Sequence, residues 1–315
     1  MRSQQIPVTR IGPPEAVEVQ TVDVGPPPPG QAVVRVEAAG VFYGDILLRT
    51  GVIPGGPKPP FVPGHDVVGV VEQVGDGVTA VVPGQPVAAL LRAGRYSQRL
   101  SVPAERLVPR PEGAAAIGSA AVALNDFIAY QMLHRVAALR AGDHILVHGA
   151  SGGVGTAFLQ LGRLAGIQCY GTAMAAKQEL VRRFGGHPID YRHQDFGQVI
   201  RGLPGGAVDA VFDAIGGPRH FRRSHSVPAR GGILVAYAQS AALVDGKASR
   251  RVGGWGSWWA WCCPSCSPVA AARGSTRPGA WTSGSRRLSA GPGRGAVGAG
   301  RRLHPARARK DDAAG

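Results

Sequence analysis

The sequence predicts an α/β protein: a β-rich N-terminal domain, a doubly wound parallel-sheet domain, and an irregular C-terminal tail. Three observations support this. Short β-branched runs separated by Pro and Gly fill the first 120 residues. Strand-like apolar runs then alternate with helical patterns. After about residue 250 both patterns stop. We therefore expect domains at 1–122 and 123–250 and a basic tail at 251–315.

The N-terminal domain is predicted from three apolar runs. They lie at 33–41, 67–75 and 86–91, and the segments PPPPG, GGPKPP and GDG fall between or beside them. Proline fixes one backbone angle and removes a hydrogen-bond donor, so this punctuation argues against long helices. The expected architecture is a set of short strands joined by turns.

The second domain is predicted from strand-like apolar runs that alternate with segments of helical apolar spacing. HILVH (144–148) has the length and character of a buried parallel strand. Residues 152–166 then repeat apolar side chains at helical spacing. Strands alternating with helices imply βαβ units. Further strands are expected at 168–172, 188–190, 208–216 and 232–238, and helices at about 177–184 and 195–201.

The formal charge of +15 is unevenly distributed. Residues 1–250 hold 24 Lys and Arg against 18 Asp and Glu, whereas residues 251–315 hold 11 against 2. The body therefore gives little reason to expect nucleic-acid binding. Neither a membrane-length apolar run nor a signal-peptide core is visible, so we expect a cytoplasmic protein without membrane partners.

A glycine-rich loop follows the first strand of the second domain. Gly149, Gly152 and Gly155 recur at every third position, and a predicted helix starts within the loop. Glycines at this spacing let the backbone turn tightly and approach a pyrophosphate at the helix N-terminus. A tight turn without a ligand is the alternative. The flanking strand and helix favour a dinucleotide site.

The surrounding residues add a family resemblance. GDHILVHGASGGVGTAFLQLGR (142–163) and PGHDVVGVVEQVGDGV (63–78), preceded by FYGDILLRTG (42–51), resemble the quinone oxidoreductase/zeta-crystallin group of the medium-chain dehydrogenase/reductase family. The resemblance spans about 15–245. It implies a GroES-like domain, a Rossmann domain, and NADPH-dependent hydride transfer to a quinone or an α,β-unsaturated carbonyl. It leaves a homodimer open. The cofactor contacts it implies include Gly149, Ser151, Gly152, Gly153, Val154, Gly155 and Thr172.

The residues after the second strand favour NADPH over NADH. NAD sites usually place an acid about 20 residues beyond the glycines, but Gly171–Met174 holds none. Lys177 follows, and a cation suits a 2′-phosphate that an acid would repel. The resemblance adds Tyr191 and Arg192 near that phosphate. The alternative for Lys177 is a solvated helix cation.

The sequence predicts no metal site. Zinc-using relatives carry a Cys-His pair where this chain has Phe42 and Tyr43, and LND (124–126) offers no thiol. His65 remains, but one imidazole cannot form a tetrahedral zinc site. We therefore expect His65 to be packed or hydrogen-bonded.

Tyr43 is the candidate catalytic residue, as a hydrogen-bond donor to a substrate oxygen. An aromatic wall of the substrate pocket is the equally weighted alternative. Asp45 and Arg49 are four residues apart, so on a helix they would pair with each other.

The tail at 251–315 has no repeating apolar face, so we expect no packed structure there. One interpretation is a basic arm, and another is a thiol site at Cys262, Cys263 and Cys266. We favour a third, translation of a GC-rich gene in a shifted frame. CSPVAAARGSTR (266–277), back-translated and read from one base earlier, can give LLAGGRRARFYS. Loss of the normal C-terminal portion would leave an NADPH-binding protein without turnover, which is the alternative function.

Overall fold

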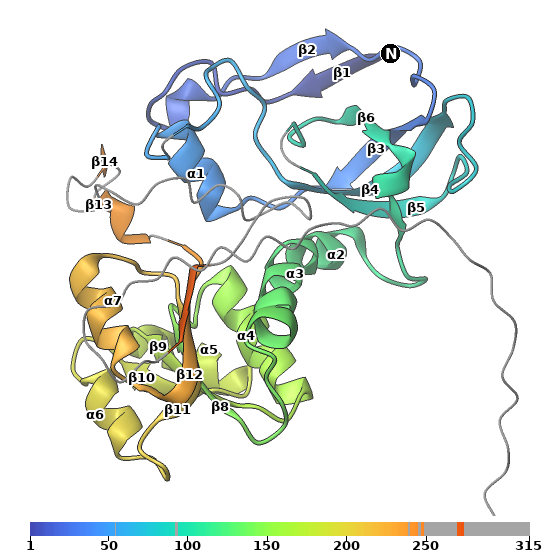
Figure 1. Ribbon diagram of the computed structural model, residues 1–315. Coiled ribbons are helices and arrows are strands. Elements are labelled where there is room, and N and C mark those ends of the chain that lie inside the picture. The colour runs from blue at the N-terminus through green and yellow to red at the C-terminus, as the bar shows by residue number, and fades with distance from the viewer. Residues whose placement is uncertain (54, 92–93, 239, 245–246, 249–269, 274–315) are drawn as a thin grey trace, which may run out of the picture.

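The computed structural model describes residues 1–53, 55–91, 94–238, 240–244, 247–248 and 270–273. Within these residues the chain forms a β-rich N-terminal unit and an α/β unit, which lie one above the other in Figure 1. The first unit contains an antiparallel sheet, and five of the six strands of the second unit's sheet run parallel. The predicted fold class is therefore confirmed.

The N-terminal unit is built on a five-stranded sheet with the order β6-β3-β4-β5-β7. Its β-branched side chains suit a pleated sheet surface, and Val34, Val71 and Val87 belong to a core of their own. The three predicted strands correspond to β3, β4 and β5. The elements are β1 (Arg2–Gln5), η1 (Pro14–Ala16), β2 (Gln20–Asp23), β3 (Gln31–Ala38), α1 (Tyr43–Arg49), β4 (Asp66–Val74), β5 (Pro86–Leu90), β6 (Arg99–Pro103), η2 (Ala104–Arg106) and β7 (Val108–Pro109).

Three helical segments connect the units. They are α2 (Ala116–Ala123), α3 (Asn125–Tyr130) and the π-helical turn η3 (Gln131–Val136). Ala129, Met132 and Leu133 pack into the core of the second unit. The sequence pattern does not predict these helices, because short helices that are apolar on several sides show no clear 3.6-residue period.

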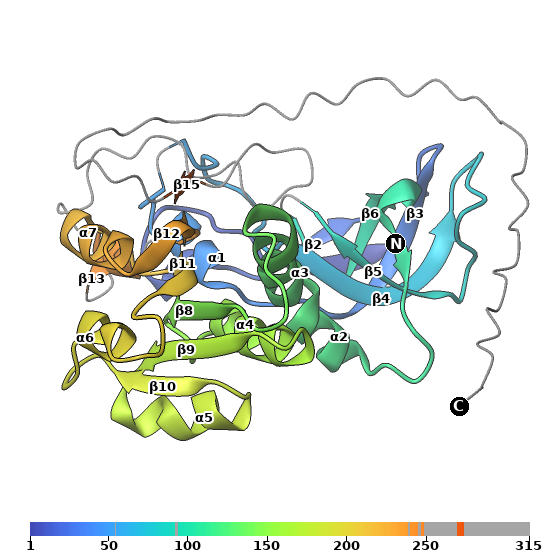
Figure 2. The ribbon, with the colours of Figure 1, turned by 60° about the horizontal axis from the view of Figure 1, so that its bottom comes forward.

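The second unit contains a six-stranded sheet in the order β10-β9-β8-β11-β12-β15. Helices cover both of its faces (Figure 2). Ile145 and Val147 of β8 pack with α4, whereas Leu146 between them packs with α6 and α7. Burial on both faces explains the uninterrupted apolar runs. The elements are β8 (His144–His148), α4 (Gly153–Leu164), β9 (Gln168–Ala173), η4 (Ala175–Lys177), α5 (Gln178–Arg183), β10 (His187–Asp190), α6 (Phe196–Arg201), β11 (Val208–Asp213), α7 (Pro218–His225) and β12 (Pro228–Ala236).

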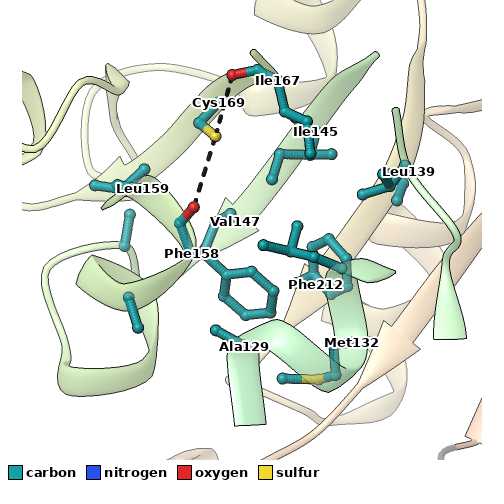
Figure 3. Packing of buried hydrophobic residues seen from close by; sticks show 14 of the residues in the cluster. Ala129, Met132, Leu139, Ile145, Val147, Phe158, Leu159, Ile167, Cys169 and Phe212 are labelled. Atoms are coloured by element: carbon teal, nitrogen blue, oxygen red, sulfur yellow. Dashed lines mark hydrogen bonds between the residues drawn. The ribbon is translucent and has the colours of Figure 1, made fainter. Parts of the chain in front are cut away.

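Phe158 of α4 lies in the larger core of this unit (Figure 3). Its ring stacks on Phe212 with centroids 4.2 Å apart. Val154 and Leu161, on the predicted apolar face of α4, pack against the same core. Burial raises the pKa of the Cys169 thiol in this core to about 12, so Cys169 is a packing residue and not a reactive thiol.

The last position of the sheet is occupied by β15 (Ala270–Arg273), which pairs antiparallel with β12. The prediction that residues 251–315 form no packed structure is therefore wrong for these four residues. The open edge of β12 offers backbone N–H and C=O groups, which an extended segment can pair with whatever its apolar pattern. The rest of the tail, including its three cysteines, lies outside the described residues. Between β12 and the tail lie η5 (Ser240–Ala242), β13 (Leu243–Val244) and β14 (Lys247–Ala248).

Across the described ranges, no helix is both long enough and apolar enough to cross a lipid bilayer.

Candidate cofactor site and active site

The predicted cofactor residues gather at one edge of the parallel sheet. The glycine loop follows the carboxyl end of β8, Lys177 follows that of β9, and Tyr191 follows that of β10. The strands are in register, with His148 beside Thr172 and Ala173 beside Asp190. In open α/β sheets, ligands bind outside the carboxyl ends of the strands.

The glycine loop has the local geometry that its residues predict. Gly149 has a φ of 72°, a backbone conformation that glycine adopts without strain. Gly152 caps α4 with an extended backbone. A side chain on Gly155 would collide with the Gly149 carbonyl and the backbone of Ala150. Glycine at this position therefore lets α4 approach the loop closely.

The remaining loop residues differ in exposure. Ser151 is half-buried, Gly153 is exposed, and half-buried Val154 packs against the core. The Asn125 carboxamide lies beside Gly153, 2.8 Å from the position that a Cβ there would take. Sequence reasoning missed Asn125, because its position beside Gly153 depends on the packing of α3 against α4.

Thr172 lies beneath the loop. Its side chain is 3% exposed, and its Oγ1 accepts a hydrogen bond from the Gly149 N–H at 3.2 Å. The Thr172 carbonyl accepts a second from the Ala150 N–H at 3.1 Å. These two hydrogen bonds hold the loop against β9, and the contact of Thr172 with the cofactor stays a prediction.

His148 extends this contact to the opposite layer of helices. Its Nδ1 lies 3.2 Å from Thr172 Oγ1, and its Nε2 lies 3.1 Å from Ser224 Oγ on α7. Burial lowers the pKa of His148 to about 3; the Asp213 carboxylate opposes this lowering, and nearby His220 and Arg223 add to it. The imidazole is therefore neutral and acts as a hydrogen-bonding bridge. No sequence pattern points to Ser224, because only the fold brings it to His148.

Asp213, at the end of β11, shapes the neighbouring loop. Its Oδ1 accepts hydrogen bonds from the N–H groups of Ile215 at 2.8 Å and Gly216 at 3.1 Å. A Cβ on Gly149 would lie 3.9 Å from the Ile215 side chain, so the two loops are neighbours. The Oδ2 atom of Asp213 lies 3.6 Å from the Nε2 atom of His220 on α7.

Lys177, Tyr191 and Arg192 are all exposed. The N–H of Arg192 donates to Asp190 Oδ1 at 3.0 Å, which fixes the turn after β10. Because β9 and β10 are adjacent parallel strands, these residues extend from neighbouring loops at the sheet's carboxyl edge. Two cations and an aromatic ring there can accompany a phosphorylated ribose.

Tyr43 is the first residue of α1, and its side chain is partly exposed. Its hydroxyl donates to the Ser240 carbonyl of the second unit at 3.4 Å. Burial raises the pKa of Tyr43, so it keeps its proton at neutral pH and can donate. The hydroxyl therefore joins α1 to the segment after β12, in which Ser240 begins η5.

The predicted pairing of Asp45 with Arg49 is wrong. Asp45 Oδ1 lies 3.3 Å from His65 Nδ1, and its Oδ2 accepts from the Tyr96 hydroxyl at 2.8 Å. Arg49 instead donates to the Gly12 carbonyl at 2.6 Å. Asp45 is buried, and it contacts His65 and Tyr96 in place of the i,i+4 pairing with Arg49. Burial works to raise the pKa of Asp45, but its hydrogen bonds from His65, Tyr96 and Gly64 lower it overall.

His65 is 3% exposed and packs edge-on against Phe42, with ring centroids 5.4 Å apart. Within the part of the chain that the structure describes, no three His, Cys, Asp or Glu side chains form a group able to hold a metal ion.

Two family models match the chain. An alcohol dehydrogenase GroES-like domain matches residues 28–116, and a zinc-binding dehydrogenase model matches residues 153–249. The rat synaptic vesicle membrane protein VAT-1 homolog is 34% identical over 80% of this chain, and the chain spans 63% of its length. A 2-haloacrylate reductase from Burkholderia sp. is 34% identical over 74% of this chain and 72% of the relative.

Solved structures of similar fold include a quinone oxidoreductase. Escherichia coli quinone oxidoreductase, solved in complex with NADPH, superposes with a TM-score of 0.71 at 26% identity. The superposition covers 78% of this chain and 75% of that one.

Proposed function

The chain belongs to the medium-chain dehydrogenase/reductase family, in its quinone oxidoreductase-like group, and on this premise we propose that it transfers hydride from NADPH to a quinone or an α,β-unsaturated carbonyl. The main observation behind this proposal is the glycine loop, which Thr172 holds against β9 at the carboxyl edge of the sheet. Relatives named for quinone and for 2-haloacrylate reduction support the acceptor class.

NADPH is proposed because the carboxyl edge of the sheet carries cations in the region where NAD-binding proteins have an acidic residue that binds the ribose. Lys177 and Arg192 are exposed after β9 and β10, and Gly171–Met174 contains no acid. The loop N–H groups and the α4 N-terminus would hold the pyrophosphate, with Ser151, Gly152 and Gly153 at its surface. The bound nicotinamide would supply the hydride.

Tyr43 is proposed to donate a hydrogen bond to the substrate oxygen that gains negative charge. Its raised pKa keeps the donor protonated, and its contact with Ser240 places it where the two units meet. The donor would have to leave Ser240 or share its proton when substrate binds. We further propose that no metal takes part, because Phe42 and Tyr43 stand at the ligand positions of zinc-using relatives.

Nucleotide binding without turnover is the second candidate, and one observation favours it. The last strand of the sheet, β15, runs antiparallel, whereas a fully doubly wound sheet would continue in parallel. Binding needs only the β8–β10 edge. Turnover as proposed would also use Tyr43, whose hydroxyl contacts Ser240 in the segment after β12.

The deciding experiment measures NADPH binding by fluorescence and 1,4-benzoquinone-dependent NADPH oxidation, both with the full chain. Binding with oxidation supports the reductase. Binding without oxidation of this or any enone supports the second candidate. Absence of NADPH binding would overturn both.

A further inference from the structure

The Asn125 carboxamide lies against the first turn of α4. Its Nδ2 is 2.8 Å, and its Oδ1 is 3.1 Å, from the position that a Cβ on Gly153 would take. Gly153 is the first residue of α4, and Asn125 is the first residue of α3. The packing of α3 against α4 therefore brings a polar side chain from outside the glycine loop into contact with that loop.

This contact lies at the end of α4 where an anion would bind. The first helical hydrogen bond runs from the Thr156 N–H to the Gly152 carbonyl at 2.8 Å. The N–H groups of residues 153–155 have no acceptor within the helix and point out of its N-terminus. A Cα–Cβ bond tilts toward the same end of a helix. The Asn125 carboxamide, which lies at the Cβ position of Gly153, is therefore at the rim of the N-terminus that would hold the pyrophosphate.

The Asn125 side chain has a donor to spare at this rim. A carboxamide carries two N–H donors. Within the residues that the structure describes, Asn125 Nδ2 donates one hydrogen bond, to the Ala121 carbonyl at 3.3 Å. Ala121 belongs to α2, so this bond restrains the half-buried carboxamide beside Gly153. The second N–H is available to a ligand.

We propose that Asn125 donates a hydrogen bond to the pyrophosphate of the bound nucleotide. This rests on the proposed function. The pyrophosphate is common to NADPH and NADH, so Asn125 contributes to the affinity for both. Lys177, in contrast, is proposed to contact the 2′-phosphate, which NADH lacks. The two residues therefore act on different parts of the same cofactor.

The test measures the binding of three nucleotides to the full chain: NADPH, NADH and adenosine 2′-monophosphate. Asn125→Ala should lower the affinity for NADPH and for NADH by the same factor, roughly ten- to a hundred-fold, which is the range for a hydrogen bond to a charged group. The affinity for adenosine 2′-monophosphate, which has no pyrophosphate, should stay nearly unchanged. Lys177→Ala should instead weaken NADPH and adenosine 2′-monophosphate and spare NADH.

Asn125→Asp separates a ligand contact from a structural role. A negative charge beside a helix N-terminus stabilises the folded protein, but it repels a pyrophosphate. Without nucleotide, Asn125→Asp should therefore unfold at a temperature no lower than Asn125→Ala. Its affinity for NADPH should nevertheless be the lower of the two. An affinity that instead follows the stability of the variants would overturn the contact.

Ser119→Ala is the matched control, because Ser119 likewise donates to a helix carbonyl of the same connecting segment, that of Ala115 at 2.9 Å. It should leave the affinity for all three nucleotides unchanged. Wild-type affinity of Asn125→Ala for NADPH, or an equal loss for adenosine 2′-monophosphate, would overturn the proposal and leave the proposed function standing. A wild type that binds no NADPH would overturn both.

Discussion

The Nε2 atom of His148 lies 3.1 Å from the Oγ atom of Ser224, and this contact joins α7 to the strand that leads into the glycine loop. On its other side, His148 contacts Thr172, whose hydroxyl accepts the Gly149 N–H. Ser224, His148 and Thr172 are at most 3% exposed. A helix on one face of the sheet is thereby linked to the backbone expected to hold pyrophosphate.

Ser224→Ala should weaken this link. Removing the hydroxyl leaves a buried imidazole nitrogen without its partner, which costs about 1–3 kcal/mol of unfolding free energy. NADPH affinity of the folded protein should also fall, because Gly149 loses part of its support. Urea unfolding and fluorescence titration measure the two effects. Ser226→Ala is the control, since its hydroxyl bonds the Arg223 carbonyl at the exposed end of α7. Equal effects of the two substitutions would contradict the role of the bridge.

The buried imidazole also predicts a pH dependence of stability. The pKa of His148 is about 3 in the folded protein, whereas an unfolded histidine titrates near 6.5. Between these values the unfolded chain binds one more proton, so acidification favours unfolding. The loss should reach about 2 kcal/mol from pH 7.5 to pH 5. Urea unfolding at the two pH values measures this loss. The loss of unfolding free energy in His148→Gln should be smaller than in the wild type by about 2 kcal/mol. Equal losses in the two proteins would show that His148 is not the origin of the pH dependence.

Lys177 should determine the preference for NADPH. Lys177→Ala should lower the affinity for NADPH by roughly ten- to a hundred-fold, which is the contribution of one charge-assisted phosphate contact. The affinity for NADH should stay nearly unchanged. Competition titrations with both nucleotides provide the measurement. Arg140→Ala is the charge-matched control, because Arg140 is exposed at the opposite edge of the sheet, before β8. If the unmodified protein bound both nucleotides equally, the phosphate role would be excluded.

Gly155 should tolerate no side chain. A Cβ there would overlap the Gly149 carbonyl and Ala150, so Gly155→Ala must push α4 from the loop. We expect a loss of at least about 2 kcal/mol in stability and strongly reduced NADPH binding. Gly118→Ala on α2 meets nothing within 4 Å and should stabilise the protein by about 0.5–1 kcal/mol. Thermal unfolding of both variants distinguishes these outcomes, and a tolerated Gly155→Ala would rule out the close approach.

The sequence predicted features that depend on local pattern. HILVH forms β8, and the glycine loop ends in α4 as its spacing required. It could not show which way Thr172 points, because that depends on β9 being beside β8. The buried position of Asp45 was likewise invisible, since Gly64 and Tyr96 are distant in sequence. Local spacing suggested Arg49 as its partner, and tertiary contacts overrode that spacing.

The strand β15 should protect the edge of β12. In its register Val235 lies opposite Ala271 and Ala236 opposite Ala270, so ending the chain at residue 250 would leave these backbone groups of β12 unpaired. An exposed edge is a template for pairing with another chain. The shortened protein should therefore unfold at a lower temperature and self-associate more than the full chain. Light scattering with thermal unfolding measures both properties. Ala271→Pro in the full chain should act in the same direction, because proline fits poorly within a paired strand. If truncation left both properties unchanged, β15 would have no role in the fold, and the basic tail would have to be explained without it.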